Sequence, residues 1–126
     1  MNILISNNSD RPIYEQIKEQ IKEQILNGYI EPGAMLPSMR LLAKELRISI
    51  ITTKRAYEDL EREGYIESFT GRGSFVKDIN SEMLKENLLF EIEELFDNAI
   101  LKSKVAGLSY EELSEILRTL YAEGEE

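Results

Sequence analysis

Four isoleucines spaced four residues apart form the first regular pattern in the chain. They are Ile13, Ile17, Ile21 and Ile25, and the positions between them are mostly glutamine, glutamate and lysine. A helix with this spacing has one apolar face and is polar elsewhere. Pro12 suits the start of a helix, and Gly28 suits the position just past its end. The pattern therefore predicts an amphipathic helix between these two residues.

Two shorter helical patterns follow within residues 36–64. The apolar positions at helical spacing are Leu41, Leu42 and Leu46 in the first, and Ala56, Tyr57 and Leu60 in the second. Residues 47–49 separate the two patterns as a three-residue turn, in which the Ser49 hydroxyl can cap the second helix. Gly64 ends that helix. The spacing predicts a helix-turn-helix whose second helix runs from about residue 50 to about residue 63.

A hairpin is predicted next, from strands at 67–69 and 74–76. The connecting segment, Thr70 to Gly73, holds two glycines that can supply positive φ. Segment 34–36 is expected to pair with this hairpin, and residues 3–5 are expected to form a short edge strand. Two helices joined by a tight turn and followed by a hairpin with a basic tip outline a winged helix-turn-helix that binds DNA.

The pattern changes after Asp78. Apolar residues near heptad spacing predict one long helix from 80 to about 105, and Gly107 interrupts it. Ser109 with Glu112 forms a capping box that starts a last helix. Two such helices cannot cover their apolar faces alone, so either they pack back on their own domain or, as we favour, they form a symmetric dimer. The expected interface residues are Leu84, Leu88, Ile92, Leu95, Phe96, Leu113, Ile116, Leu117 and Leu120.

The 126 residues suffice for one small domain and an appendage. We expect a mainly α fold with a small β wing: a winged helix-turn-helix domain over residues 1–78 and a short two-helix dimerisation unit over residues 79–126. The chain has no cysteine, and its start lacks the basic and apolar regions of a signal peptide. No apolar run approaches the roughly 20 residues that span a bilayer, so we expect a cytoplasmic protein without membrane contact.

The net charge of −9 is unevenly distributed. Residues 1–78 carry 11 basic and 12 acidic side chains, whereas residues 79–126 carry 4 and 12. Within residues 36–77 the basic side chains outnumber the acidic ones, 8 to 6. Acidity is therefore concentrated in the tail. Salt screens charges that are farther apart than the Debye length of about 8 Å, so a remote acidic tail repels DNA only weakly.

The residues between Leu36 and Val76 resemble the GntR family of bacterial transcription regulators. The points of match are Leu36, Pro37, Ser38, Arg40, Leu42, Ala43, Leu46, Ile48, Ser49, Thr52, Ala56, Tyr57, Leu60, Gly64, Ile66, Gly71, Gly73, Phe75 and Val76. The resemblance extends back through residues 12–17, which are similar to the family's first helix. The tail is too short for either large effector domain common in the family. Its form is similar to the YtrA subfamily, whose members add only a small helical dimerisation unit.

On the second helix of the helix-turn-helix, the spacing turns Thr53 inward and Thr52, Lys54 and Arg55 outward. Thr52 can meet a phosphate, a base edge or a thymine methyl group, and one of the two cations could bind guanine. The alternative for Lys54 and Arg55 is ordinary solvated surface charge.

The family resemblance implies that Arg40 reaches DNA, and the alternative is an ion pair within the protein. The Ser38 hydroxyl and nearby backbone N–H groups suit a phosphate at a helix N-terminus. Gly71 and Arg72 resemble the family's minor-groove probe, because glycine permits close approach and a cation favours the negative groove. The expected DNA-contacting residues are Ser38, Arg40, Ser49, Ile50, Thr52, Lys54, Arg55, Thr70, Gly71 and Arg72.

One position departs from the family pattern. Immediately after the capping residue the family usually has arginine, whereas this chain has Ile50, followed by Ile51. The change removes a direct hydrogen bond worth about 1–3 kcal/mol of base discrimination. Ile50 could instead pack against a thymine methyl group. We therefore expect an operator that differs from the family's usual sequence.

Together these patterns predict a transcription regulator, with repression favoured by the resemblance, that binds an inverted-repeat operator in double-stranded DNA as a homodimer. An enzyme is disfavoured because the chain has neither His nor Cys, and we expect no catalytic residues, metal or cofactor. The other alternative is a winged-helix protein-interaction module without specific DNA binding. Ile50 and the overall acidity favour that module, whereas the exposed cations oppose it. A cleft at the dimer interface could accommodate a small-molecule effector.

Overall fold

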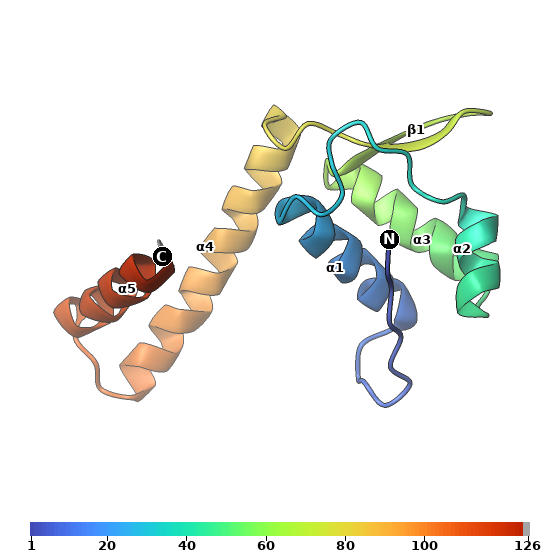
Figure 1. Cartoon of the computed structure of the whole chain (residues 1–126). Helices are drawn as coiled ribbons and strands as arrows, with labels where there is room; N and C mark the ends of the chain where they lie inside the picture. The colour runs from blue at the N-terminus through green and yellow to red at the C-terminus, as the bar shows by residue number, and fades with distance from the viewer. Residues whose placement is uncertain (125–126) are drawn as a thin grey trace. The chain divides into compact units, whose positions relative to one another are not determined.

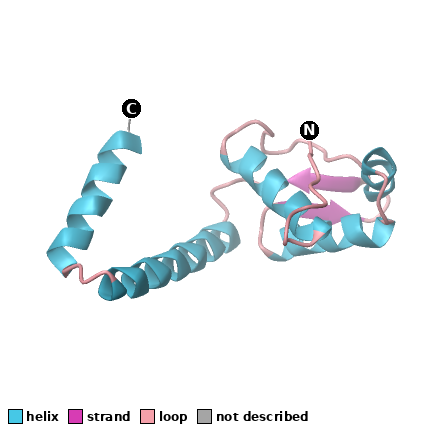
Figure 2. Cartoon of the chain, turned by 90° about the horizontal axis from the view of Figure 1, so that it is seen from below, coloured by secondary structure: helices cyan, strands magenta, loops and turns pink. Residues whose placement is uncertain are grey.

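A computed structural model describes residues 1–124 of the chain and has the predicted mainly helical fold with one antiparallel hairpin among these residues (Figures 1 and 2). The elements are α1 (Ile13–Leu26), α2 (Met39–Leu46), α3 (Ile50–Arg62), β1 (Ile66–Phe69), β2 (Gly73–Val76), α4 (Glu82–Val105) and α5 (Tyr110–Gly124). Contacts divide the chain into a unit that ends at Asn87 and a second unit that begins at Leu88. The division of function between residues 1–78 and 79–126 stays a prediction.

The core of the first unit lies where α1 packs against α3. Ile17 and Ile21 of α1 and Tyr57 and Leu60 of α3 are almost completely buried. The isoleucine stripe therefore faces the core as its spacing predicts. Leu41 of α2 differs, because it is about half exposed although its neighbour Leu42 is buried.

The turn between α2 and α3 lies where the sequence predicts it. Arg47 adopts a left-handed conformation with φ of 57°, and the backbone N–H of Ile48 donates to the Ala43 carbonyl at 3.0 Å. The Ser49 hydroxyl then caps α3 by accepting from the Ile51 N–H at 3.1 Å. Ser38 caps α2 by accepting from the Leu41 N–H at 3.1 Å, and so lies directly before that helix.

The hairpin of β1 and β2 pairs Ile66 with Val76 and Phe69 with Gly73. Gly71 and Gly73 have φ of 78° and 110°, which an L side chain rarely adopts, so these turn positions favour glycine. The predicted pairing of residues 34–36 is confirmed: Met35 bridges to Phe75. This bridge fastens the segment before α2 to the wing.

The prediction of a strand at residues 3–5 is wrong. The backbone groups of this segment form hydrogen bonds with side chains of α1 instead of with a neighbouring strand. The Gln20 amide donates to the Leu4 carbonyl at 2.6 Å and accepts from its N–H at 2.8 Å. Gln16 makes the same pair of bonds with Ser6, at 3.0 and 2.8 Å. A primary amide carries both a donor and an acceptor, so it can replace the backbone of a strand partner. The glutamines of α1 thus hold an extended N-terminal segment.

The start of α4 belongs to the first unit. Leu84 is fully buried there, and a Cβ on Gly64 would lie 3.0 Å from the Leu84 nitrogen. The Asn87 side chain also donates to the Glu63 carbonyl at 2.6 Å. These contacts correct the assignment of Leu84 to a dimer interface, because its side chain is already covered within its own chain.

In the second unit, the predicted break and capping box are confirmed. Gly107 has φ of 76°, and Ser109 and Glu112 exchange hydrogen bonds of 3.0 and 3.1 Å at the start of α5.

Within the described residues, no helix combines the length and apolarity that crossing a bilayer requires.

Candidate DNA-binding surface

The first turns of α3 present a mixed surface of apolar, hydroxyl and cationic side chains. Ile50, Ile51, Lys54 and Arg55 are exposed, and Thr52 is half-buried. Thr53 points inward as predicted, and its hydroxyl lies 3.0 Å from the Met39 carbonyl and 2.9 Å from the Ile50 carbonyl. Because the Thr53 hydroxyl contacts a carbonyl at the start of each helix, the beginnings of α2 and α3 are held side by side.

Arg40, the second residue of α2, is exposed beside that junction. It makes no ion pair with any residue from 1 to 124, so the described structure gives the alternative of an internal ion pair no support. Lys54 does have a partner, Glu58, at 3.9 Å, but both side chains are more than half exposed. Such a pair contributes little, so Lys54 can exchange it for a phosphate at small cost.

Arg55 stacks on an aromatic ring that belongs to another helix. Its guanidinium carbon lies 3.8 Å from the centre of the Tyr14 ring on α1. Stacking holds the planar guanidinium in place while its edges can still donate hydrogen bonds. The sequence turns Arg55 outward on α3, but it carries no signal for where α1 and α3 cross.

The wing tip is built for close approach to another surface. Thr70, Gly71 and Arg72 are all exposed, and within residues 1–124 no atom beyond the chain neighbours of Gly71 lies within 4 Å of the position that a Cβ on Gly71 would take. The Arg72 N–H donates to the Phe69 carbonyl at 2.9 Å and closes the turn. Behind the tip, the rings of Phe69 and Phe75 are 6.1 Å apart and brace the two strands.

Tyr57 fixes α3 against the segment that leads into α2. Its hydroxyl donates to the Pro37 carbonyl at 2.7 Å, next to the capping Ser38. Burial raises the pKa of the Tyr57 phenol well above its ordinary value, so the donor stays protonated at physiological pH. The hydrogen bond sets the distance between the first residues of α2 and the face of α3.

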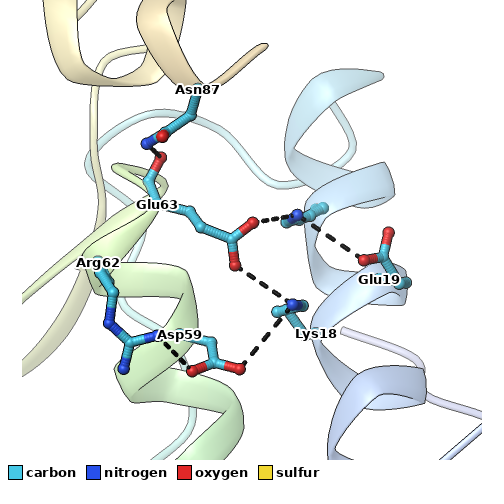
Figure 3. Close-up of polar contacts among 7 residues, drawn as sticks. Lys18, Glu19, Asp59, Arg62, Glu63 and Asn87 are labelled. Atoms are coloured by element: carbon cyan, nitrogen blue, oxygen red, sulfur yellow. Dashed lines mark hydrogen bonds and ion pairs between the residues drawn. The ribbon is translucent and has the colours of Figure 1, made fainter. Parts of the chain in front are cut away.

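Acidic side chains near the end of α3 are paired with lysines of α1 (Figure 3). Lys18 lies 3.8 Å from Asp59 and 3.3 Å from Glu63, and Lys22 also contacts Glu63. A helix rises about 1.5 Å per residue, which puts Glu63 about 20 Å from Ile50 along the axis. The carboxylates are thus neutralised at one end of α3, while exposed cations remain at the other.

This surface suits a polyanion better than a metal ion or a small substrate. The residues from 1 to 124 contain no group of three His, Cys, Asp or Glu side chains that could hold a metal ion. The expected DNA-contacting residues occupy three places: the start of α2, the first turns of α3 and the wing tip. Ser38 and Ser49 cap α2 and α3. At these two helix N-termini, backbone N–H groups can bind an anion such as a phosphate.

A separate feature lies within the second unit, where α4 and α5 form an open apolar groove of about 490 Å³. Six expected interface residues line it: Leu95, Phe96, Leu113, Ile116, Leu117 and Leu120. Ile92 is also exposed, and Leu88 is half-buried. Tyr110 lines the groove as well, although its position just after the capping serine gave no sign of that role.

Comparison with known proteins gives consistent matches. Residues 13–76 match the sequence model described as bacterial regulatory proteins, gntR family. The HTH-type transcriptional repressor YtrA of Bacillus subtilis (strain 168) is 38% identical over 121 residues, which are 96% of this chain and 93% of that protein.

Two solved structures are also similar. YtrA from Sulfolobus acidocaldarius, described as a GntR-family transcription factor, has a TM-score of 0.63 and 30% identity, and the match covers 98% of this chain and 100% of that one. AraR(DBD) in complex with operator ORX1 has a TM-score of 0.54 and 30% identity, over 60% of this chain and 95% of that one.

Proposed function

The chain belongs to the GntR family of bacterial regulatory proteins, and we propose that it represses transcription as a homodimer bound to an inverted-repeat operator. It is a DNA-binding transcription regulator of the YtrA-like type, with a winged helix-turn-helix followed by a short helical tail. Repression is proposed because a relative of nearly the same length is named as a repressor.

The observation that carries the proposed DNA contacts is the grouping of exposed cations at one end of the helix-turn-helix. Arg40 lies in the first turn of α2, Lys54 and Arg55 lie in the first two turns of α3, and Arg72 lies at the wing tip. In helix-turn-helix proteins the first residues of the recognition helix contact base edges in the major groove. We assign that role to Ile50, Thr52 and Lys54.

The remaining contacts are proposed to fix the position of the duplex. Ser38, Ser49 and Arg40 would bind phosphates at the two helix N-termini, where backbone N–H groups favour anions. Thr70, Gly71 and Arg72 would enter the minor groove, since Gly71 leaves open space at the tip. Such contacts set register and affinity, while α3 supplies sequence preference.

We propose a dimer because the groove between α4 and α5 needs a partner to cover it. Its walls expose large apolar side chains that a second copy of the same surface could cover, and two-fold pairing is the commonest way to do so. A two-fold dimer presents two copies of α3 to one duplex. Its operator should therefore contain two half-sites in inverted orientation.

Selection of bound fragments from sheared genomic DNA tests the proposal. The purified protein should enrich fragments that share an inverted repeat, and the affinity for them should fall steeply as salt is raised, because several phosphates are neutralised. The matched control is the double variant Arg40→Ala with Lys54→Ala, checked for folding by circular dichroism. Equal enrichment by the wild type and this control would contradict specific binding through this surface.

The exposed pair Ile50 and Ile51 favours a second candidate, a winged-helix module that binds another protein. The same selection separates the two functions, because such a module would enrich no operator. We propose no catalytic activity, in line with the absence of His and Cys from the sequence.

A further inference from the structure

Two isoleucines at the start of α3 remain exposed within the described structure. Ile50 is 41% exposed and Ile51 is 78% exposed, although both belong to a first turn whose neighbour Thr53 is completely buried. The inward face of α3 is made by Thr53, Ala56, Tyr57 and Leu60, so the isoleucines lie outside the core. Burying one such side chain is favourable by about 1.5–3 kcal/mol, so they are suited to a partner that covers them.

The two side chains are held firmly at this place. The Ser49 hydroxyl accepts from the Ile51 N–H at 3.1 Å, which fixes the first turn of the helix. Isoleucine is branched at Cβ and adopts one strongly preferred χ1 rotamer in a helix. Little conformational entropy is therefore lost when these side chains meet a partner.

The surroundings identify the partner as DNA. The Thr53 hydroxyl contacts both the Met39 and the Ile50 carbonyl, so exposed Arg40, which follows Met39, lies close to the isoleucines. Lys54 is exposed one turn further along α3. An apolar protein partner would have to bury these cations without counter-charges, which is costly. A duplex instead offers phosphates to the cations and a groove to the isoleucines.

Within the major groove, the apolar group that a base presents is the C5 methyl of thymine. We propose that Ile50 and Ile51 recognise thymine methyl groups in each half-site of the operator, so that α3 selects sequence partly through apolar contact. This inference rests on the proposed function and deepens it. It predicts A·T pairs, with thymine on a defined strand, where each half-site faces the start of α3.

Replacing thymine by deoxyuridine tests the inference, because the change removes only the methyl group and keeps base pairing. The duplex is the inverted repeat recovered by genomic selection, with one thymine per half-site replaced at a time. At one or two positions the wild type should bind the deoxyuridine duplex about fourfold more weakly for each half-site altered, as expected for one buried methyl group. Replacement in the flanking sequence should change nothing.

Alanine variants complete the test. In Ile50→Ala or Ile51→Ala, one of the sensitive positions should lose its dependence on the methyl group. Leu4→Ala, at an exposed apolar residue elsewhere in the first unit, should behave like wild type. Equal affinity of the wild type for every thymine and deoxyuridine duplex would overturn the inference, as would full methyl dependence in both isoleucine variants. Failure of the wild type to bind any unsubstituted duplex would defeat the proposed function itself.

Discussion

At the scale of single residues, Arg40 and Lys54 carry the same charge in different surroundings. Lys54 has an exposed glutamate partner at 3.9 Å, whereas Arg40 makes no ion pair within the described residues. Arginine also presents a rigid planar fork of N–H donors that matches phosphate and guanine, whereas lysine acts as a point charge on a flexible stem. Arg40 is therefore expected to contribute more to operator binding than Lys54 does.

Replacing Arg40 by alanine should weaken operator binding about tenfold or more and leave the fold intact, because a hydrogen bond to a charged group such as a phosphate is worth about 1.5–3 kcal/mol. Lys54→Ala should cost less, and each variant that loses a phosphate contact should lower the salt-dependence slope by about 1. Fluorescence anisotropy at several salt concentrations measures both quantities.

The control for Arg40 is Arg118→Ala, which removes the same charge from an exposed position on α5. This variant should keep wild-type affinity. If Arg40→Ala and Arg118→Ala behave alike, Arg40 has no place in the DNA surface.

Gly71→Val tests the wing tip. Valine at φ of 78° is strained by roughly 1–2 kcal/mol, and it also puts a branched side chain where the tip should enter the minor groove. The operator affinity should fall by more than the loss of stability explains. Arg72→Ala should lower affinity more evenly across DNA sequences, because a groove cation acts mainly through electrostatic attraction.

Gly28→Val is a matched control for the strain, since Gly28 has φ of 83° and equally open surroundings at the end of α1. Both variants should lose similar stability in thermal unfolding, but only Gly71→Val should lose DNA affinity. Normal operator binding by a folded Gly71→Val protein would remove the wing from the interface.

For single residues, the sequence indicated whether a side chain points into the core or outward better than it indicated which residue that side chain contacts. The apolar spacing of α3 correctly placed Thr53 inside and Lys54 outside, because a helix of known period has only one way to bury that stripe. It did not reveal that Arg55 stacks on Tyr14, since that contact depends on where two helices cross. Periodicity within one element contains no information about such a crossing.

At the scale of elements, the joint between α2 and α3 depends on one buried phenol. Tyr57 donates to the Pro37 carbonyl, and the neutral form is favoured because burial raises the pKa of its hydroxyl. The folded pKa lies above the unfolded value of about 10. The stabilisation is therefore complete below that pH and is lost as the pH rises toward the folded pKa.

Tyr57→Phe should lower the free energy of unfolding by about 1 kcal/mol at neutral pH, because the Pro37 carbonyl loses its donor. The gap between wild type and variant should narrow above pH 10, since phenylalanine cannot ionise. Urea unfolding between pH 7 and pH 11 measures this, with Tyr29→Phe at an exposed tyrosine as the control. Parallel stability curves for wild type and Tyr57→Phe would show that the buried hydroxyl does not fix the joint.

The elements that were predicted correctly have strong local signals, and the one that failed has only a short apolar run. Capping serines and turn glycines located the helix ends and the hairpin, because they act on backbone groups a few residues away. Residues 3–5 are apolar and β-branched in part, which suggested a strand. Their hydrogen-bond partners are glutamine side chains on α1, 16 positions along the chain in the pair of Leu4 and Gln20.

At the scale of the whole molecule, charge and apolar surface are divided between the two parts of the chain. Residues 79–126 hold 12 of the 24 acidic side chains, and the carboxylates at the end of α3 are paired with lysines of α1. The surface proposed for DNA is thereby left with exposed cations, of which only Lys54 has a weak, solvent-exposed glutamate partner within the described residues. In the second unit, α4 and α5 instead line a groove with apolar side chains, as the apolar centre of an interface does.

Leu95→Asp should convert the protein to monomers, because it puts a charge into the apolar groove proposed as the dimer interface. Each large side chain covered by a partner contributes about 1.5–3 kcal/mol before the cost of association, and an unpaired carboxylate cannot be buried there. Leu101→Asp is the matched control: Leu101 is 63% exposed, close to the 67% of Leu95, but it does not line the groove. Sedimentation velocity at micromolar concentration should show dimers for the wild type and Leu101→Asp and monomers for Leu95→Asp.

Binding to the full operator should then fall sharply in Leu95→Asp while single half-site binding stays nearly unchanged. Dissociation of both variants would place the interface elsewhere on α4, and a monomeric wild type would exclude the dimer and, with it, the reason for an inverted repeat.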